Sequence, residues 1–141
     1  MPDPIIYNSA ELDLSQRFKR TTAIVASPVD ATETIIASLT IADDLAIMQG
    51  VFLEGWAAFV VGTNGTAARL RIRQTNVAGT VKADTDALTG GVAAAGKLAQ
   101  DVLGFDTAAV LPGQVYVLTL AVTAATAAST VSAVMLRASV I

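Results

Sequence analysis

Three arginines alternate with leucine and isoleucine in the sequence RLRIR, residues 69–73. Successive side chains of a β-strand point to opposite faces, so the pattern predicts a strand with the aliphatic residues on one face and the arginines on the other. A guanidinium group can donate two parallel hydrogen bonds to a carboxylate. Arg69, Arg71 and Arg73 are therefore candidate contacts for acidic groups on a partner. A plain solvated face would give the same alternation, and a cross-strand Glu54 could neutralise part of the charge.

Two aspartate pairs, Asp43-Asp44 and Asp84-Thr85-Asp86, could contribute to a cation site because hard cations take several carboxylate oxygens. Neither matches a complete metal-binding loop, and roles in turns or in solvent are favoured. The chain has no His and no Cys, which removes the histidine-dependent triads, thiolate metal sites and disulfides. The sequence therefore predicts no catalytic residue, no metal, no cofactor and no enzymatic activity.

The N-terminal residues 1–20 differ from the rest because two prolines, an apolar patch and a basic run lie close together there. No partner strand is near in sequence, so the segment is predicted to be an extended arm that lies on something else, for example a neighbouring subunit. A short helical turn over residues 9–18 is an alternative for part of it. Its candidate partner-binding residues are Ile5, Ile6, Tyr7, Arg17, Phe18, Lys19 and Arg20.

Composition favours assembly over chemistry. Of the 141 residues, 53% are hydrophobic and 15% are charged, against about 25% charged in typical globular domains. A chain of this length cannot bury the whole apolar surplus in one monomer, so we expect part of it at a subunit interface. The net charge of -3 argues against a nucleic-acid groove, which needs clustered cations. The basic run of the arm is therefore expected to contact protein in preference to nucleic acid.

No membrane partner is expected. The most apolar stretch, residues 45–61, contains Gln49 and Glu54 and is shorter than the ~20 residues of a spanning helix. The opening residues 1–4 lack the cationic start and apolar core of a secretory signal. We interpret residues 45–61 as buried β-structure, with Trp56 and Phe59 in the core.

Residues 21–141 are predicted to form one all-β domain. Runs rich in Val, Ile, Thr and aromatics alternate with Pro, Gly, Asp and Asn clusters, which is typical of a sandwich or barrel. Residues 77–107 are ambiguous and are predicted to form a long loop followed by a strand near 98–105. The other expected strands are 22–26, 33–41, 46–61 with a break at Gly50 or Gly55, 67–75, 115–123 and 130–140.

Two turns are specified by their residue types. Asn64-Gly65 predicts a type I′ hairpin that pairs the strand ending at Val61 with the strand beginning near Ala67. Pro112-Gly113 predicts a type II turn, with the glycine at positive φ, before the strand that starts at Val115.

Residues 27–41, 111–120 and 129–141 together resemble the single jelly-roll domains of phage virion proteins. Residues 21–141 are most similar to small head-decoration (cement) proteins, and more distantly to the trimeric heads of the tumour-necrosis-factor and C1q type. The resemblance implies a jelly-roll-like β-sandwich with an extended N-terminal arm. It also implies a homotrimer that clamps major capsid protein subunits on the capsid surface of a virion, after synthesis in the host cytoplasm.

The function predicted from the sequence is therefore a structural virion protein that stabilises a capsid exterior. The alternative is the receptor- or glycan-binding head domain of a phage tail fibre, which would use the same trimeric fold. Both hypotheses make the chain a binding protein with itself as one partner.

Overall fold

Nine β-strands and no helix are found in the part of the chain that the structure describes, residues 18–21, 33–41, 50–89, 96–108, 113–125, 127 and 129–140 of a computed structural model. None of these residues belongs to a helix that could cross a membrane. The strands are β1 (Phe18–Thr21), β2 (Thr34–Thr40), β3 (Val51–Val60), β4 (Ala67–Gln74), β5 (Val81–Asp84), β6 (Leu88–Thr89), β7 (Lys97–Asp106), β8 (Val115–Thr123) and β9 (Thr130–Val140).

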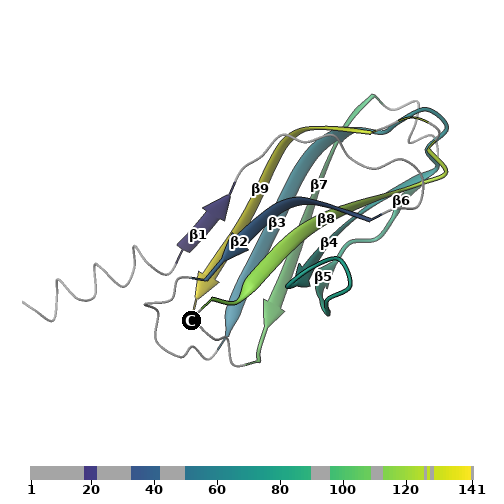
Figure 1. The fold of residues 1–141 in the computed structure, drawn as a ribbon. Helices are drawn as coiled ribbons and strands as arrows, with labels where there is room; N and C mark the ends of the chain where they lie inside the picture. The colour runs from purple at the N-terminus through teal and green to yellow at the C-terminus, as the bar shows by residue number, and fades with distance from the viewer. Residues whose placement is uncertain are drawn as a thin grey trace, which may run out of the picture.

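The strands form two antiparallel sheets that pack face to face (Figure 1). Sheet A has the order β1-β9-β3-β7, and sheet B has the order β2-β8-β4-β5, with β6 also paired to β4. The first four strands alternate between the sheets, and β8 and β9 each enter the middle of a sheet. This arrangement confirms the predicted all-β, jelly-roll-like sandwich.

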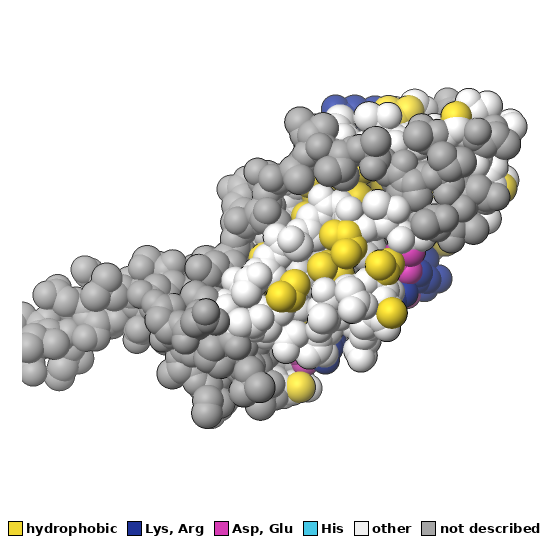
Figure 2. Space-filling model, in the orientation of Figure 1, with side chains coloured by type: hydrophobic (Ala, Val, Ile, Leu, Met, Phe, Trp, Pro, Cys, Tyr) yellow, Lys and Arg dark blue, Asp and Glu magenta, His cyan; other side chains and the backbone are white. Residues whose placement is uncertain are grey.

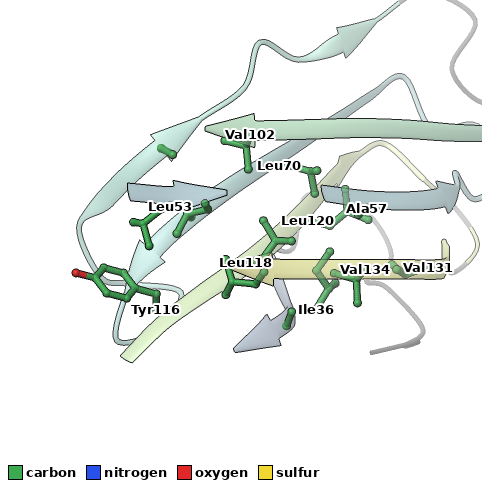
Figure 3. Packing of buried hydrophobic residues seen from close by; sticks show 14 of the residues in the cluster. Ile36, Leu53, Ala57, Leu70, Val102, Tyr116, Leu118, Leu120, Val131 and Val134 are labelled. Atoms are coloured by element: carbon green, nitrogen blue, oxygen red, sulfur yellow. The ribbon is translucent and has the colours of Figure 1, made fainter. Parts of the chain in front are cut away.

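The core lies between the sheets and follows the period-two alternation of the strands. In β8 the side chains of Leu118, Leu120 and Val122 are fully buried. Across from them, Leu53 and Phe59 of β3 are also fully buried. Figure 3 shows labelled side chains from both sheets gathered in the space between them. Each buried Leu or Phe contributes about 1.5–3 kcal/mol through loss of water contact.

Most strand predictions agree with the structure. The expected strands at 33–41, 67–75, 115–123 and 130–140 correspond to β2, β4, β8 and β9, and the strand near 98–105 is β7. The expected strand at 22–26 lies outside the described residues, as do all of residues 42–49, which include the start of the strand expected at 46–61. The short strands β5 and β6, within residues 77–107, were not predicted, because each has too few residues to show alternation.

Gly55 does not break β3, contrary to one of the two break positions expected. The strand begins at Val51, directly after Gly50, and continues to Val60. A Cβ atom at Gly55 would lie 2.7 Å from Cδ1 of Leu118 in the opposite sheet. The glycine therefore makes room for a core leucine, which is a packing role within a continuous strand.

The predicted Asn64-Gly65 hairpin is wrong. Strands β3 and β4 belong to different sheets, so the turn is a corner between layers and the two strands do not pair. Asn64 has φ 63°, whereas Gly65 does not have positive φ, and the Gly65 N–H donates to the Gly62 carbonyl at 3.1 Å. Positive φ at only the third turn position is not the type I′ geometry that suits a hairpin.

Gly113 has the positive φ, 81°, that the type II turn prediction requires. Its N–H donates to the carbonyl of Ile41 at 2.9 Å, which ties the start of β8 to the end of β2. Pro112 lies outside the described residues. The prediction that a strand begins at Val115 is confirmed.

Candidate interaction surfaces

The alternating arginines of β4 lie on the outer face of sheet B, where they join two carboxylates in an arrangement that we call the arginine ladder (Arg69, Arg71, Arg73, Glu33 and Asp84). Arg69 holds Asp84 through two hydrogen bonds of 2.6 and 2.7 Å. Arg73 holds Glu33 through two of 2.7 and 2.8 Å. Arg71 bridges the carboxylates, at 3.0 Å to Glu33 and 3.2 Å to Asp84. Bidentate guanidinium–carboxylate pairs of this kind are the strong form of ion pair.

Glu33 is the centre of the ladder. Burial alone would raise its pKa, but hydrogen bonds from Arg73 and Thr119 and the charges of Arg73 and Arg71 outweigh burial and lower the pKa. The pKa of Arg73 is raised, mainly by the hydrogen bond to Glu33. Both groups are therefore charged at neutral pH and are neutralised within the chain.

Basic and acidic side chains consequently lie side by side along the β4–β5 side of the molecule (Figure 2). The expected counterion Glu54 is not part of this group, because it lies on β3 in the other sheet and its carboxylate is 3.6 Å from Arg137. The role of Arg69, Arg71 and Arg73 in binding a partner stays a prediction, since an external acid would compete with Glu33 and Asp84.

The aspartates considered as cation ligands have other roles or lie outside the described residues. Asp84 accepts from Arg69 and Arg71, while the backbone carbonyl of Asp86 accepts from Gln100. Asp43-Asp44 belongs to residues that the structure does not describe. Within the described ranges, no group of three or more His, Cys, Asp or Glu residues could hold a metal ion.

Asp106 forms a second polar cluster that sequence reasoning missed. It ends β7 of sheet A and accepts hydrogen bonds from Lys82 at 3.0 Å and from Tyr116 at 2.9 Å, both in sheet B. The Ala108 N–H adds a bond of 3.1 Å. Figure 3 shows the Tyr116 ring beside the core with its hydroxyl oxygen pointing away from the other labelled side chains. The cluster, which we call the Asp106 lock, joins the two sheets at one edge of the sandwich.

Burial would raise the pKa of Asp106, but the bonds from Lys82, Tyr116 and Ala108 and the Lys82 charge lower it. The pKa of Tyr116 is raised by burial and by the adjacent Asp106 carboxylate. The lock thus consists of an ionised carboxylate held by a neutral phenol and a lysine. An aspartate beside Phe105 at a strand end gives no sequence signal for this, because its partners come from distant strands.

The outer face of sheet A is different, because large apolar side chains remain exposed on it. Leu103 is 56% exposed, Phe105 47% and Phe52 38%. Phe105 lies directly opposite Phe52 in the β7–β3 pairing, so these residues form a continuous apolar edge patch (Phe52, Leu103 and Phe105). Nothing in the described part of the chain covers it.

The aromatic residues of β3 divide between the two faces of the sheet. Phe59 is fully buried, as predicted. Trp56 is only partly buried, since it alternates with the buried Gly55 and Ala57 and lies opposite the exposed Asp101. Its assignment to the core was therefore wrong. Its side chain lies on the outer face of sheet A, outside the apolar edge patch.

The candidate residues of the N-terminal arm are only partly described. Phe18, Lys19 and Arg20 lie in β1, which pairs antiparallel with β9 at the edge of sheet A. This strand begins three residues before the predicted start of the sandwich at residue 21. Ile5, Ile6, Tyr7 and Arg17 lie outside the described residues, as does the alternative helical turn before Phe18.

Comparison with known proteins found no matching family model and no matching curated protein. Among solved structures, a chain of the Bacillus endospore appendages, a family of disulfide-linked pili, is 18% identical, with a TM-score of 0.44 and 88% of each chain covered. A chain of the infectious bursal disease virus VP2 subviral particle is 13% identical, with a TM-score of 0.45 over 88% of this chain. This chain spans only 33% of that viral chain. The similar chains are thus subunits of pili and of virus particles.

Proposed function

We propose that this chain is a structural virion protein that binds and stabilises a capsid exterior as a decoration or cement protein. The observation that supports this most is the contrast in how side chains are satisfied. The charged groups of the arginine ladder and the Asp106 lock are paired within the chain, whereas Leu103 and Phe105 are left in water. Other large apolar side chains are exposed too, but Leu103 and Phe105 are the most exposed and adjoin Phe52. A contiguous apolar patch of this kind is typical of a protein contact.

The described residues also support binding in preference to catalysis. The titratable groups with shifted pKa values belong to ion pairs that connect strands: Glu33 with the arginines, and Asp106 with Lys82 and Tyr116. A bound shell protein acts by mass action, because it adds binding free energy to the assembled state and none to the free coat subunit. Stabilisation of a capsid therefore needs no turnover.

We further propose that the N-terminal arm adds to this contact, with Ile5, Ile6 and Tyr7 as apolar anchors and Arg17, Lys19 and Arg20 facing acidic groups of coat subunits. In this proposal the domains associate as a homotrimer on the capsid surface. Aromatic and arginine residues are the usual anchors of protein interfaces.

Co-sedimentation tests the proposed function. The full chain is mixed with undecorated capsid particles assembled from a purified major capsid protein, and the mixture is run on a density gradient. We expect the chain to travel with the particles and to raise the temperature at which they rupture. A variant lacking residues 1–17 keeps β1 and should bind more weakly while its own melting temperature stays the same.

The same experiment separates the two hypotheses about function. A chain that stays at the top of the gradient, and does not change the rupture temperature of the particles, contradicts the capsid-binding proposal. If that chain instead binds host cells, and soluble glycans compete for this binding, the tail-fibre alternative is correct.

A further inference from the structure

Strand β7 is an edge of sheet A whose C-terminal half, residues 102–106, lacks the usual protection, whereas the exposed charges Lys97 and Asp101 lie in its N-terminal half. It pairs with β3 over all ten residues without a register shift, and β3 is its one strand partner among the described residues. Natural edge strands are usually blunted by prolines, bulges or outward charges, which stop other chains from pairing with them. Residues 102–106 have none of these. Their single charge, Asp106, is taken up by Lys82 and Tyr116.

The apolar side chains on this edge are arranged symmetrically. Leu103 and Phe105 are the two most exposed large hydrophobic residues of the described chain, and they flank Gly104 on the outer face. A Cβ atom at Gly104 would lie 2.4 Å from the Ala83 Cβ and 2.7 Å from the Lys82 carbonyl oxygen. Gly104 is therefore packed against β5 on the inner side, while its two neighbours face water.

We propose that β7 pairs antiparallel with β7 of a second copy of this chain, about a two-fold axis at Gly104. This register places Leu103 of each copy opposite Phe105 of the other. With Phe52 already beside Phe105, the pairing joins both apolar edge patches into one cluster. Such a contact is isologous, so it needs only this one surface used twice.

Two neighbouring registers, with the axis one or two residues closer to the N-terminus, are less favourable. An axis at Leu103 places Asp101 opposite Phe105, and an axis at Val102 places Asp101 opposite Leu103. Each leaves a carboxylate against an apolar side chain. Around Gly104 the charges also permit approach, since Asp106 is paired with Lys82 and Glu54 lies near Arg137. The second copy therefore meets no unpaired like charge within residues 102–106.

The overlap is short, so we expect a concentration-dependent contact that links chains, or trimers if these form, in pairs. It goes beyond the proposed function, because it needs neither a capsid nor the N-terminal arm. It uses the same apolar edge patch as the proposed capsid contact, so a second copy and a capsid would compete for Leu103 and Phe105. The two proposals are distinguished because the β7 contact is tested in the absence of capsid particles.

Cysteine cross-linking tests the register directly, since the chain has no Cys of its own. In the proposed pairing Asp101 lies opposite Thr107 of the second copy, and both residues are exposed. Directly opposite side chains have Cβ atoms about 5 Å apart, whereas two copies of the same position are offset by six residues, about 20 Å. Asp101→Cys and Thr107→Cys are purified separately, mixed and treated with a short thiol cross-linker.

We expect the mixture to form a cross-linked dimer at least ten times faster than either variant alone. The cross-link should be lost when Leu103→Ser and Phe105→Ser are added to both partners. It should persist with Val60→Ser or Ile35→Ser, which remove apolar side chains of similar exposure, 42% and 39%, away from residues 102–106. It should also persist without residues 1–17.

Four outcomes would overturn the proposal. Equal cross-linking within and between variants would show random encounter or another register. Loss of cross-linking on deletion of residues 1–17 would assign the contact to the arm. No cross-link at concentrations where the chain is shown to self-associate would place that association elsewhere, and a chain that stays monomeric would exclude the contact altogether. Circular dichroism confirms that each variant is folded.

Discussion

The two outer faces of the sandwich differ: charged side chains are paired on one, and large apolar side chains are exposed to water on the other. On sheet B, Arg71 and Arg73 form ion pairs with Glu33, so these positive charges of β4 are neutralised within the chain. On sheet A, Leu103 and Phe105 stay in water although the strand that carries them is well packed against β3. The difference shows that an alternating charged motif can be structural, while the exposed apolar patch that we propose as a contact surface carries no sequence motif.

The largest loss of stability is expected when the contact that joins the two sheets at Asp106 is removed. Replacing Asp106 with alanine leaves Lys82 without its carboxylate and the Tyr116 hydroxyl without its acceptor. Breaking a buried pair of this kind costs about 3 kcal/mol, which corresponds to a fall of about 10 °C in melting temperature for a domain of this size. Thermal unfolding followed by circular dichroism measures the change.

Asp101→Ala is the matched control, because Asp101 lies on the same strand and is exposed. It should change stability by less than about 0.5 kcal/mol. Equal losses in the two variants would mean that the Asp106 lock does not hold the sheets together.

The next test removes the centre of the arginine ladder. Glu33→Ala places Arg71 and Arg73 side by side without a counterion. We expect a loss of about 2 kcal/mol, below the range for fully buried pairs because the three side chains are partly exposed. Glu54→Ala, which removes the 3.6 Å contact with Arg137 on the other face, should cost less than about 0.5 kcal/mol. Urea unfolding of the single and double variants of Glu33 and Arg73 isolates their coupling.

The pH dependence of stability tests the arginine ladder and the Asp106 lock together. The pKa values of Glu33 and Asp106 are lowered in the folded chain from ordinary values of 4.5 and 3.8. The unfolded chain therefore binds these protons first, so the stabilisation is present above those values and is lost as the pH falls through the lower folded pKa values. A Glu33→Gln, Asp106→Asn variant should be less stable at neutral pH and lose less on acidification.

The alkaline side has the opposite sign. Because the pKa of Tyr116 is raised above its ordinary 10.0, the folded chain keeps a proton that the unfolded chain releases. Stability should fall as the pH rises past 10.0, and Tyr116→Phe should reduce that fall. Unfolding curves collected across the pH range measure the losses of stability in acid and in alkali. If the Glu33→Gln, Asp106→Asn variant lost as much stability in acid as the unchanged chain, these two carboxylates would not be the cause of the acid loss.

The smallest effect on stability is expected on the outer face of sheet A. Leu103→Ser and Phe105→Ser remove exposed side chains, so the free energy of unfolding should change by less than about 0.5 kcal/mol for each. Solubility and self-association should nonetheless change, as measured by light scattering over a range of concentrations. A large destabilisation would mean that these residues belong to the core, and the contrast between the faces would disappear.

The sequence predicted the strand that contains Arg69–Arg73 because burial on one face leaves a period of two. It predicted the strand Val115–Thr123 from its content of β-branched and aromatic residues, since both of its faces are largely buried. It also predicted the two-layer class. It did not predict that Asn64-Gly65 joins strands of different sheets, since a turn residue reports only its local φ. The partners of Asp106 and Glu33 were missed because they come from strands far apart in the chain, and exposure of Leu103 depends on which strand ends at an edge.

The order of the strands has a consequence for synthesis. Strands β8 and β9 follow all others in the sequence, yet β9 separates β1 from β3 and β8 separates β2 from β4. A nascent chain that has produced everything up to β7 holds both sheets with their centres missing. Such topologies fold slowly because distant segments must meet before any sheet is complete. Both sheets can therefore be completed only after β8 and β9 have been synthesised, and we expect folding of the sandwich to begin late in translation.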